Sequence, residues 1–151
     1  MDAFRVDRAE RVLFPAVDTL RERLSERGWR MTAQRRVIAG VFDVAPDGHL
    51  HLTADEVHER AVAVLPEISR ATVYNTLGEL VDAGELLAVQ TGGRVTRYDP
   101  NVAGIHHHLV CTNCHAIFDV PAQAVPLPEI PVDFTVESAE VIFRGRCSNC
   151  G

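Results

Sequence analysis

Four cysteines stand in the last third of the chain as two Cys-x-x-Cys pairs, Cys111 with Cys114 and Cys147 with Cys150. One tight turn brings two sulfurs to the spacing that zinc requires, and a second turn completes a tetrahedron. No cysteine is left over, and in a reducing compartment this pattern favours metal ligation over disulfides. A dithiol redox pair is the alternative, but it needs a βαβ setting that the sequence lacks. The spacing predicts a structural zinc site.

A second group of possible ligands begins five residues before the first cysteine. His106 and His108 lie two apart, so in a strand they project from one face, whereas His107 and Cys111 project from the other. This parity separates the imidazoles from the thiolates and predicts two sites of different character. Imidazoles joined by carboxylates suit a harder, more exchangeable metal than zinc, although a solvated strand edge would look the same. Further candidate ligands stand nearby in the sequence: His51, Asp99 and Asp119.

The elements that must position these residues follow from capping and periodicity. Amphipathic helices are predicted over Pro15–Arg27, Thr32–Ala45, Thr53–Val64 and Arg70–Ala83. Two short strands joined by Gly92 and Gly93 are predicted next, over Leu86–Thr91 and Arg94–Tyr98. Helices followed by a hairpin are typical of a winged helix-turn-helix, whose last helix enters the major groove.

Beyond this hairpin the pattern changes to strands. Segments 107–111, 116–120 and 135–145 read as strands, and a proline-rich connection precedes the last of them. We expect an α+β protein with a winged-helix domain over residues 1–98, of which 1–14 are an extension. A hinge over 99–104 and a C-terminal α/β dimerisation domain over 105–151 would follow.

Composition restricts the function less than the motifs do. The 151 residues are 46% hydrophobic and carry a formal charge of −6, which argues against a nucleic-acid partner. All fifteen basic residues are arginine, however, and six of them lie between Arg21 and Arg36 against two acids, a local balance of +4. No apolar run is long enough for a membrane span and the N-terminus has no secretory h-region, so we expect a cytoplasmic protein.

The predicted fourth helix carries the candidate DNA-reading side chains. Its apolar positions follow a helical stripe, and the opposite face is polar. Tyr74 lies beside the apolar Val73, so burial of this ring is an alternative to DNA contact. The predicted contacts to DNA are Arg70, Thr72, Tyr74 and Asn75 in the groove, with Arg30, Arg35 and Arg94 on phosphates.

Five segments together resemble the ferric uptake regulator family of metal-dependent repressors, from about residue 18 to the end of the chain. They are Trp29–Arg35, Leu52–Glu56, Ser69–Asn75, His106–Cys114 and Cys147–Cys150. The stretch from Arg30 to Leu80 is most similar to the actinobacterial catalase repressors, which belong to the peroxide-sensing branch. Aspartate at positions 99 and 119 is also typical of that branch.

The resemblance implies a homodimer that binds a palindromic DNA operator. It implies structural zinc on the four cysteines and regulatory Fe²⁺ or Mn²⁺ on His51, Asp99, His106, His108 and Asp119. In the peroxide-sensing branch, oxidation converts a ligand imidazole to 2-oxohistidine, and His51 and His106 match the susceptible positions. A third metal site of some relatives is expected to be absent, because only His107 among the matching positions is a good ligand.

We therefore expect a repressor of oxidative-stress genes such as catalase that releases DNA when peroxide oxidises its iron site. An iron- or zinc-responsive repressor of metal uptake with the same fold is the alternative within the family. A hydrolytic metal enzyme is disfavoured, because five protein ligands leave little room for a substrate. A zinc-stapled interaction module without a DNA role also stays open.

Overall fold

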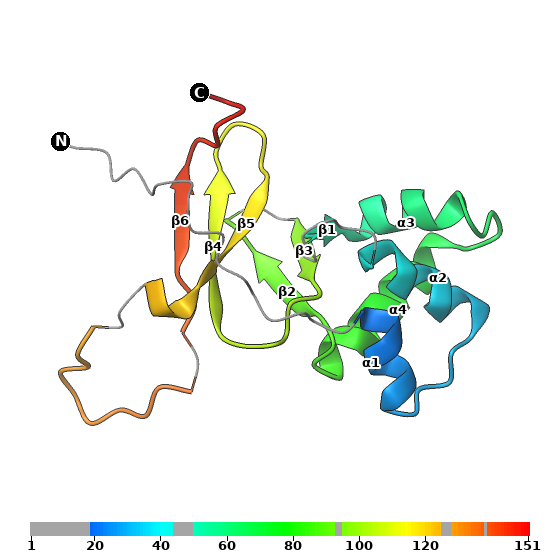
Figure 1. Ribbon diagram of the computed structural model, residues 1–151, viewed down its shortest axis with the longest axis horizontal. Coiled ribbons are helices and arrows are strands. Elements are labelled where there is room, and N and C mark those ends of the chain that lie inside the picture. The colour runs from blue at the N-terminus through cyan, green and yellow to red at the C-terminus, as the bar shows by residue number, and fades with distance from the viewer. Residues whose placement is uncertain (1–18, 44–49, 93–94, 125–127, 138) are drawn as a thin grey trace.

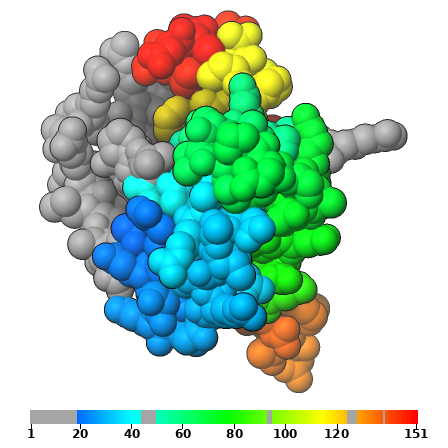
Figure 2. Space-filling model, turned by 90° about the vertical axis from the view of Figure 1, so that its right-hand side faces the viewer, coloured from blue at the N-terminus to red at the C-terminus, as the bar shows by residue number. Residues whose placement is uncertain are grey.

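The computed structural model describes residues 19–43, 50–92, 95–124, 128–137 and 139–151. It has an α+β fold, with four helices and one small sheet in its N-terminal part and a second sheet in its C-terminal part (Figure 1). The helices gather on one side of the molecule, seen end-on in Figure 2 in blue to green. None of the described helices has the length and apolar character that a bilayer span requires. The predicted extension 1–14 lies outside the described residues.

Each helix begins at a hydroxyl side chain that satisfies an exposed backbone N–H group. Thr19 and Thr53 form capping boxes, in which the glutamate three residues later bonds back to the cap. Thr32 and Ser69 cap the other two helices through Arg35 N–H and Thr72 N–H. The helices run over α1 Leu20–Glu26, α2 Ala33–Phe42, α3 Ala54–Val62 and α4 Arg70–Asp82. All four predicted helices are therefore present; α3 and α4 are shorter than predicted, and residues 15–18 and 44–45 of the first two predictions lie outside the described residues.

The main hydrophobic core lies among these helices. Leu24, Ile38, Val57 and Leu77 are fully buried, one from each helix. Burial of such a side chain stabilises the fold by roughly 1.5–3 kcal/mol. The predicted apolar stripe of α4 faces this core, and its other face is left toward solvent.

The small sheet has the order β1-β3-β2 and contains the predicted hairpin. Strands β2 Leu87–Gln90 and β3 Thr96–Asp99 pair antiparallel, while Gly93 and Arg94 of the predicted tip lie outside the described residues. Strand β1, Leu52–Thr53, was not predicted, because two residues are too few to show a period. Leu52 pairs with Tyr98 in antiparallel register, so the preceding residue, His51, comes to lie beside Asp99.

The second sheet has the order β5-β4-β6, with β4 His106–Cys111 in the centre. Strand β5, Ile117–Pro121, runs antiparallel to β4 and sets Asp119 opposite His108. It is followed by the short 3₁₀ helix Ala122–Ala124. Strand β6, Ile142–Gly145, pairs parallel with β4. The prediction of a strand from Thr135 was wrong, because β6 covers only the last four residues of that segment.

Candidate metal centres and DNA-facing surface

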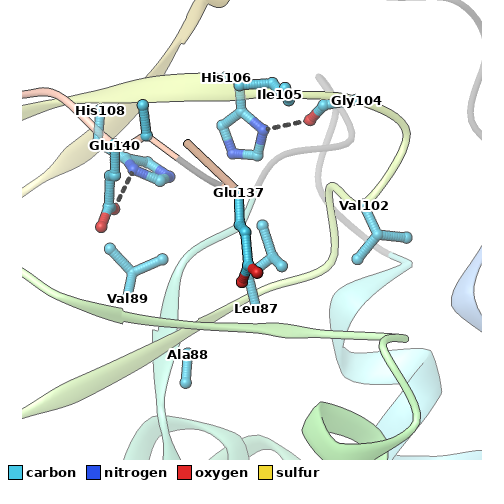
Figure 3. A pocket seen from close by; sticks show the side chains of 11 residues that line it. Leu87, Ala88, Val89, Val102, Gly104, Ile105, His106, His108, Glu137 and Glu140 are labelled. Atoms are coloured by element: carbon cyan, nitrogen blue, oxygen red, sulfur yellow. Dashed lines mark hydrogen bonds and ion pairs between the residues drawn. The ribbon is translucent and has the colours of Figure 1, made fainter. Parts of the chain in front are cut away.

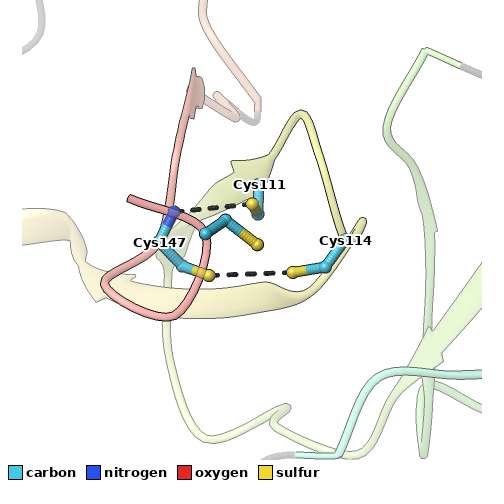
Figure 4. A group of neighbouring side chains, drawn as sticks. Cys111, Cys114 and Cys147 are labelled. Atoms are coloured by element: carbon cyan, nitrogen blue, oxygen red, sulfur yellow. Dashed lines mark hydrogen bonds between the residues drawn. The ribbon is translucent and has the colours of Figure 1, made fainter.

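The four cysteines come together at one end of the second sheet (Figure 4). Their sulfurs all lie within 4.8 Å of one another, and Cys114 Sγ is 3.7 Å from Cys147 Sγ. Two sulfurs on one tetrahedral zinc are about 3.8 Å apart, because each Zn–S bond is about 2.3 Å long. The thiols are free rather than paired in disulfides. The predicted zinc geometry is thus already present in the protein fold.

Backbone N–H groups prepare one of these thiols to ionise. The amides of Cys114, Cys147 and Asn113 lower the pKa of Cys111 to about 5. The Ala116 amide also favours the Cys114 thiolate, but the neighbouring thiols outweigh it and raise the pKa of Cys114. Four clustered thiols cannot all ionise without a cation among them, and a zinc dication supplies that charge.

The predicted nitrogen and oxygen ligands also converge, at a point between the two sheets. Asp99 Oδ2 lies 2.8 Å from His106 Nε2, 3.3 Å from His51 Nε2 and 3.4 Å from His108 Nε2. Asp119 Oδ1 lies 2.9 Å from His51 Nε2 and within 3.9 Å of the other two rings. All five side chains are at most 3% exposed.

The arrangement of His51 tests whether these residues fit a metal. Its Nε2 atom points between two carboxylates, yet neither of its ring nitrogens makes a well-aligned hydrogen bond within the described residues. A buried polar atom without such a bond is costly, so it signals a missing partner. Atoms of four ligands, all but His106, lie within 4.8 Å of one another. The set of three imidazoles and two carboxylates therefore suits a divalent cation such as Fe²⁺ or Mn²⁺.

The pKa values in this cluster depend on the contacts between its carboxylates and its imidazoles. Burial favours neutral His51, but contacts with Asp119 and Asp99 outweigh burial and raise the pKa of His51 to about 9. The pKa of His106 is raised in the same way, against burial, mainly by Asp99. Burial would raise the pKa of Asp99, but the three imidazoles hold it far below its usual range. Without a metal the carboxylates favour the protonated forms of His51 and His106, and a metal must displace those protons.

A pocket of about 390 Å³ opens beside the two β4 histidines (Figure 3). It is lined by β2, the segment after β3, and three residues ahead of β6: Glu137, Ala139 and Glu140. His106 Nδ1 lies 3.1 Å from the Gly104 carbonyl and His108 Nδ1 lies 3.1 Å from Glu140 Oε1. These contacts hold both rings with Nε2 turned toward the carboxylates. The pocket gives small molecules a route to the histidine edges.

His107 projects away from this cluster, as strand parity predicted. Its Nδ1 atom accepts a hydrogen bond from Val141 N–H, at 3.2 Å. This bond joins β4 to the residue before β6. Cys111 follows on the same face and is the buried member of the cysteine cluster. The two clusters are therefore separated because successive side chains of β4 project from opposite faces of the sheet.

The polar face of α4 carries exposed Arg70, Tyr74 and Asn75. Tyr74 is 51% exposed, so the alternative of a buried ring is wrong. Thr72 is half-buried, and its hydroxyl lies 2.9 Å from that of Ser69 at the helix cap. Arg70 contacts the Asp55 carboxylate of α3. Three of the four predicted groove contacts thus lie on one open surface.

The predicted phosphate-binding arginines differ in their surroundings. Arg30 is exposed. Arg35 pairs with Glu79 of α4 at 2.6 Å and lies over the Trp29 ring, 5.1 Å from its centroid. Arg35 must therefore exchange a carboxylate for a phosphate in order to bind DNA. Arg94 lies outside the described residues.

Comparison with known proteins agrees with this architecture. The sequence profile of the ferric uptake regulator family matches residues 26–130. The chain belongs to the ferric uptake regulator family. Members are transcriptional regulators, and this chain is accordingly a metal-responsive transcriptional regulator rather than an enzyme.

Two relatives and two solved structures illustrate the range of the family. The transcriptional regulator FurA of Mycobacterium tuberculosis is 34% identical over 110 residues, 70% of this chain and 75% of the relative. The peroxide-responsive repressor PerR of Staphylococcus aureus is 32% identical over 133 residues, 84% and 86% of the two chains. A zinc-bound manganese uptake regulator superposes with a TM-score of 0.64 at 29% identity, covering 86% and 99%. The Helicobacter pylori ferric uptake regulator, at 20% identity and a TM-score of 0.64 over 87% and 88%, shares the fold.

Sequence reasoning missed the residues that support the metal cluster of this family member. Asn101 is buried between the two carboxylates and bonds to both. Asn101 follows Asp99 by two residues, the spacing of an Asx turn, which was the available signal. Glu140 gave no signal, since 32 residues separate it from His108.

A buried ion pair in the helical part was missed as well. Glu85 is fully buried and pairs with two arginines, Arg23 within α1 and Arg27 at the C-cap of that helix. Arg23 also donates to the carbonyl of Pro100 at 3.1 Å. This hydrogen bond connects Pro100, the residue after Asp99, to α1.

Proposed function

We propose that this chain is a DNA-binding repressor that senses hydrogen peroxide through an Fe²⁺ or Mn²⁺ site. Its release from DNA would derepress oxidative-stress genes such as catalase. The observation that carries the proposal is the convergence of five buried nitrogen and oxygen ligands drawn from both sheets and from the loop before β1. The ligands we assign to the regulatory metal are His51, Asp99, His106, His108 and Asp119. The four cysteines are assigned to structural zinc.

The comparisons support both kinds of metal and the sensing branch. Solved relatives are described as a zinc-bound manganese uptake regulator and as a ferric uptake regulator with iron. The S. aureus relative is described as peroxide-responsive. Aspartate at both carboxylate positions, which the family resemblance gives as typical of the peroxide-sensing branch, points the same way. A response to iron alone is the second candidate, because a Bacillus subtilis ferric uptake regulation protein is 28% identical over 89% of this chain.

The domain assignment follows the two sheets. We propose a DNA-binding domain over residues 1–98, a hinge over 99–104 and a dimerisation domain over 105–151. Leu109, Phe118 and Phe143 are exposed and adjacent across β4, β5 and β6, which leaves an apolar face suited to a second copy. The chain would therefore act as a homodimer on a palindromic operator.

The ligands are mechanically connected to the helices that meet DNA. Arg97 donates to the His51 carbonyl at 3.1 Å and to Glu56 at 3.1 Å, and Glu56 closes the capping box of α3. α3 in turn packs on α4. On the other side, Arg23 ties the Pro100 carbonyl to α1. Holding His51 and Asp99 against β4 and β5 therefore fixes the helices relative to the second sheet.

This connection gives the metal a way to control DNA binding. Two recognition helices in a dimer must match the spacing of two half-sites, so a fixed angle between the domains favours the DNA-competent form. In that form, Arg70, Thr72, Tyr74 and Asn75 would contact bases. Arg30, Arg35 and Arg94 would contact phosphates.

Peroxide sensing would use the same imidazoles. Fe²⁺ held there would activate peroxide, which is the two-electron oxidant: one of its oxygens would end on the ring and the other would leave as water. His51 and His106 present their rings at the cluster, and His106 also borders the pocket that opens to it. Oxidation of either ring to 2-oxohistidine removes a neutral imidazole donor. His51 and Asp99 then separate from β4 and β5, and the helices lose their fixed position.

A gel shift on catalase-type promoter DNA tests this proposal. We expect binding with Fe²⁺ or Mn²⁺, and loss of binding after peroxide only in the Fe²⁺ sample. Mass spectrometry of the released protein should then show +16 Da on the peptides that contain His51 or His106, and the Mn²⁺ sample is the control. Peroxide-insensitive binding with Fe²⁺ would favour the iron-responsive alternative. Release without histidine oxidation would point to the zinc thiols instead.

A further inference from the structure

Asn101 occupies the space between the two carboxylates of the metal cluster. It is 3% exposed. Its backbone N–H donates to Asp99 Oδ1 at 2.8 Å, and its side-chain Nδ2 donates to Asp119 Oδ2 at 2.8 Å. One residue of the segment after β3 thus holds a carboxylate from each sheet.

These two bonds divide the carboxylate oxygens into two kinds. Asp99 Oδ1 and Asp119 Oδ2 accept from Asn101, whereas Asp99 Oδ2 and Asp119 Oδ1 face the imidazoles. A carboxylate can bind a cation through one oxygen or through both. An oxygen that accepts an N–H bond on the far side of its carboxylate is held away from the cation. Each aspartate is therefore limited to one ligand atom.

We propose that Asn101 is a positioning residue that keeps both aspartates monodentate and thereby sets the coordination number and preference of the metal site. The inference rests on the proposed regulatory site. With Asn101 in place, three imidazole nitrogens and two oxygens give five ligand atoms. Without its amide, Asp119 can turn and offer both oxygens. A site with more oxygen ligands accommodates larger, more loosely held cations.

The two bonds of Asn101 can be separated by mutation. The bond to Asp99 uses the backbone N–H, which any residue except proline would supply at this position. Only the bond to Asp119 requires the amide side chain. Asn101→Ala therefore removes one bond and leaves the other. Asn101→Asp keeps the size but sets a second acceptor against Asp119.

The test measures metal binding on the full-length protein with its zinc retained. Affinity for Mn²⁺ is measured by chelator competition, and the site is also loaded with Co²⁺, whose visible absorption weakens as coordination rises from five to six. Because loss of an outer partner typically costs 10–100-fold in affinity, we expect Asn101→Ala to weaken Mn²⁺ binding by about that factor. Its Co²⁺ absorption should fall. Asn101→Asp should be weaker still.

Controls separate positioning from a general structural role. Thr76→Ala alters a buried polar residue of α4 and should leave both metal readouts unchanged. If Asn101→Ala fails to fold, Asn101→Ser carries the same prediction. Unchanged Mn²⁺ affinity and Co²⁺ absorption in a folded Asn101 variant would overturn the positioning role alone. Failure of the parent protein to bind Mn²⁺ or Co²⁺ beyond its zinc would overturn the proposed site together with this inference.

Discussion

The two candidate metal centres are built in opposite ways. The cysteine centre uses two turns at one end of one sheet, and Cys114 is exposed. The histidine–aspartate centre collects buried side chains from the loop before β1, the end of β3, and strands β4 and β5. A metal in the first centre holds one sheet together, whereas a metal in the second joins the two sheets. The difference explains how one small protein can combine a permanent metal with a signalling metal.

Loss of a cysteine ligand should have the largest effect. Cys147→Ser is expected to lose zinc and unfold the second sheet, because zinc binding of this kind contributes on the order of 10–16 kcal/mol in small zinc peptides. Zinc content by elemental analysis and circular dichroism would measure the loss. Ser148→Ala changes the same turn without touching a sulfur and should retain zinc. If the Cys147→Ser protein lost its zinc but kept its thermal transition, zinc would not be what holds the second sheet together.

Loss of a histidine ligand should leave the fold intact. His108→Ala is expected to weaken Mn²⁺ binding by at least ~100-fold, about 3 kcal/mol, since a direct ligand contributes more than an outer partner. Zinc content should not change. His58→Ala removes an imidazole that lies outside the cluster, where it bonds to the Ile68 carbonyl, and serves as the control. Equal Mn²⁺ affinity in His108→Ala would show that this cluster is not the second metal site.

The second centre should also respond to pH in a way that depends on its metal. Without added Mn²⁺ or Fe²⁺, the raised pKa of His51 stabilises the fold fully below its unfolded value of 6.5, and this stabilisation is lost as pH rises through about 9. The expected decrease in unfolding free energy is about 3 kcal/mol, which urea titrations can measure. With saturating Mn²⁺ the trend should reverse, because neutral imidazoles bind metal. His51→Gln should flatten the metal-free curve, and an unaltered curve in that variant would assign the effect elsewhere.

The smallest effect on Mn²⁺ affinity is expected for Glu140, at the edge of the histidine–aspartate centre. Glu140 bonds His108 Nδ1, but its side chain is 49% exposed. Glu140→Ala should therefore weaken Mn²⁺ binding by only about 10-fold, the low end for an outer partner. Glu137→Ala, which alters another acidic residue of the same pocket, is the matched control. If both variants behave alike, the general charge of the pocket rather than the bond to His108 sets the affinity.

More of the cysteine centre than of the histidine–aspartate centre could be predicted from the sequence. The cysteine site follows from covalent spacing, and the separation of His107 from its neighbours follows from the two-residue period of a strand. The meeting of His51 with Asp99 depends on β1, which is too short to leave a pattern, so only family resemblance indicated it. The bond from Asn101 to Asp119 and the bond from Glu140 to His108 join residues far apart in the sequence, so no local pattern encodes them. The length of strand β6 was overestimated because the Val- and Ile-containing segment begins several residues before β4 offers a partner.

Operator binding by the parent protein and by His51→Ala, titrated with Mn²⁺, tests the central claim most directly. His51 is the ligand that the helical part contributes ahead of β1, so its loss should uncouple metal from the helices while zinc and fold persist. The account predicts that Mn²⁺ strengthens DNA binding of the parent and leaves the variant at its weak metal-free affinity. An equal response to Mn²⁺ in both proteins would contradict it.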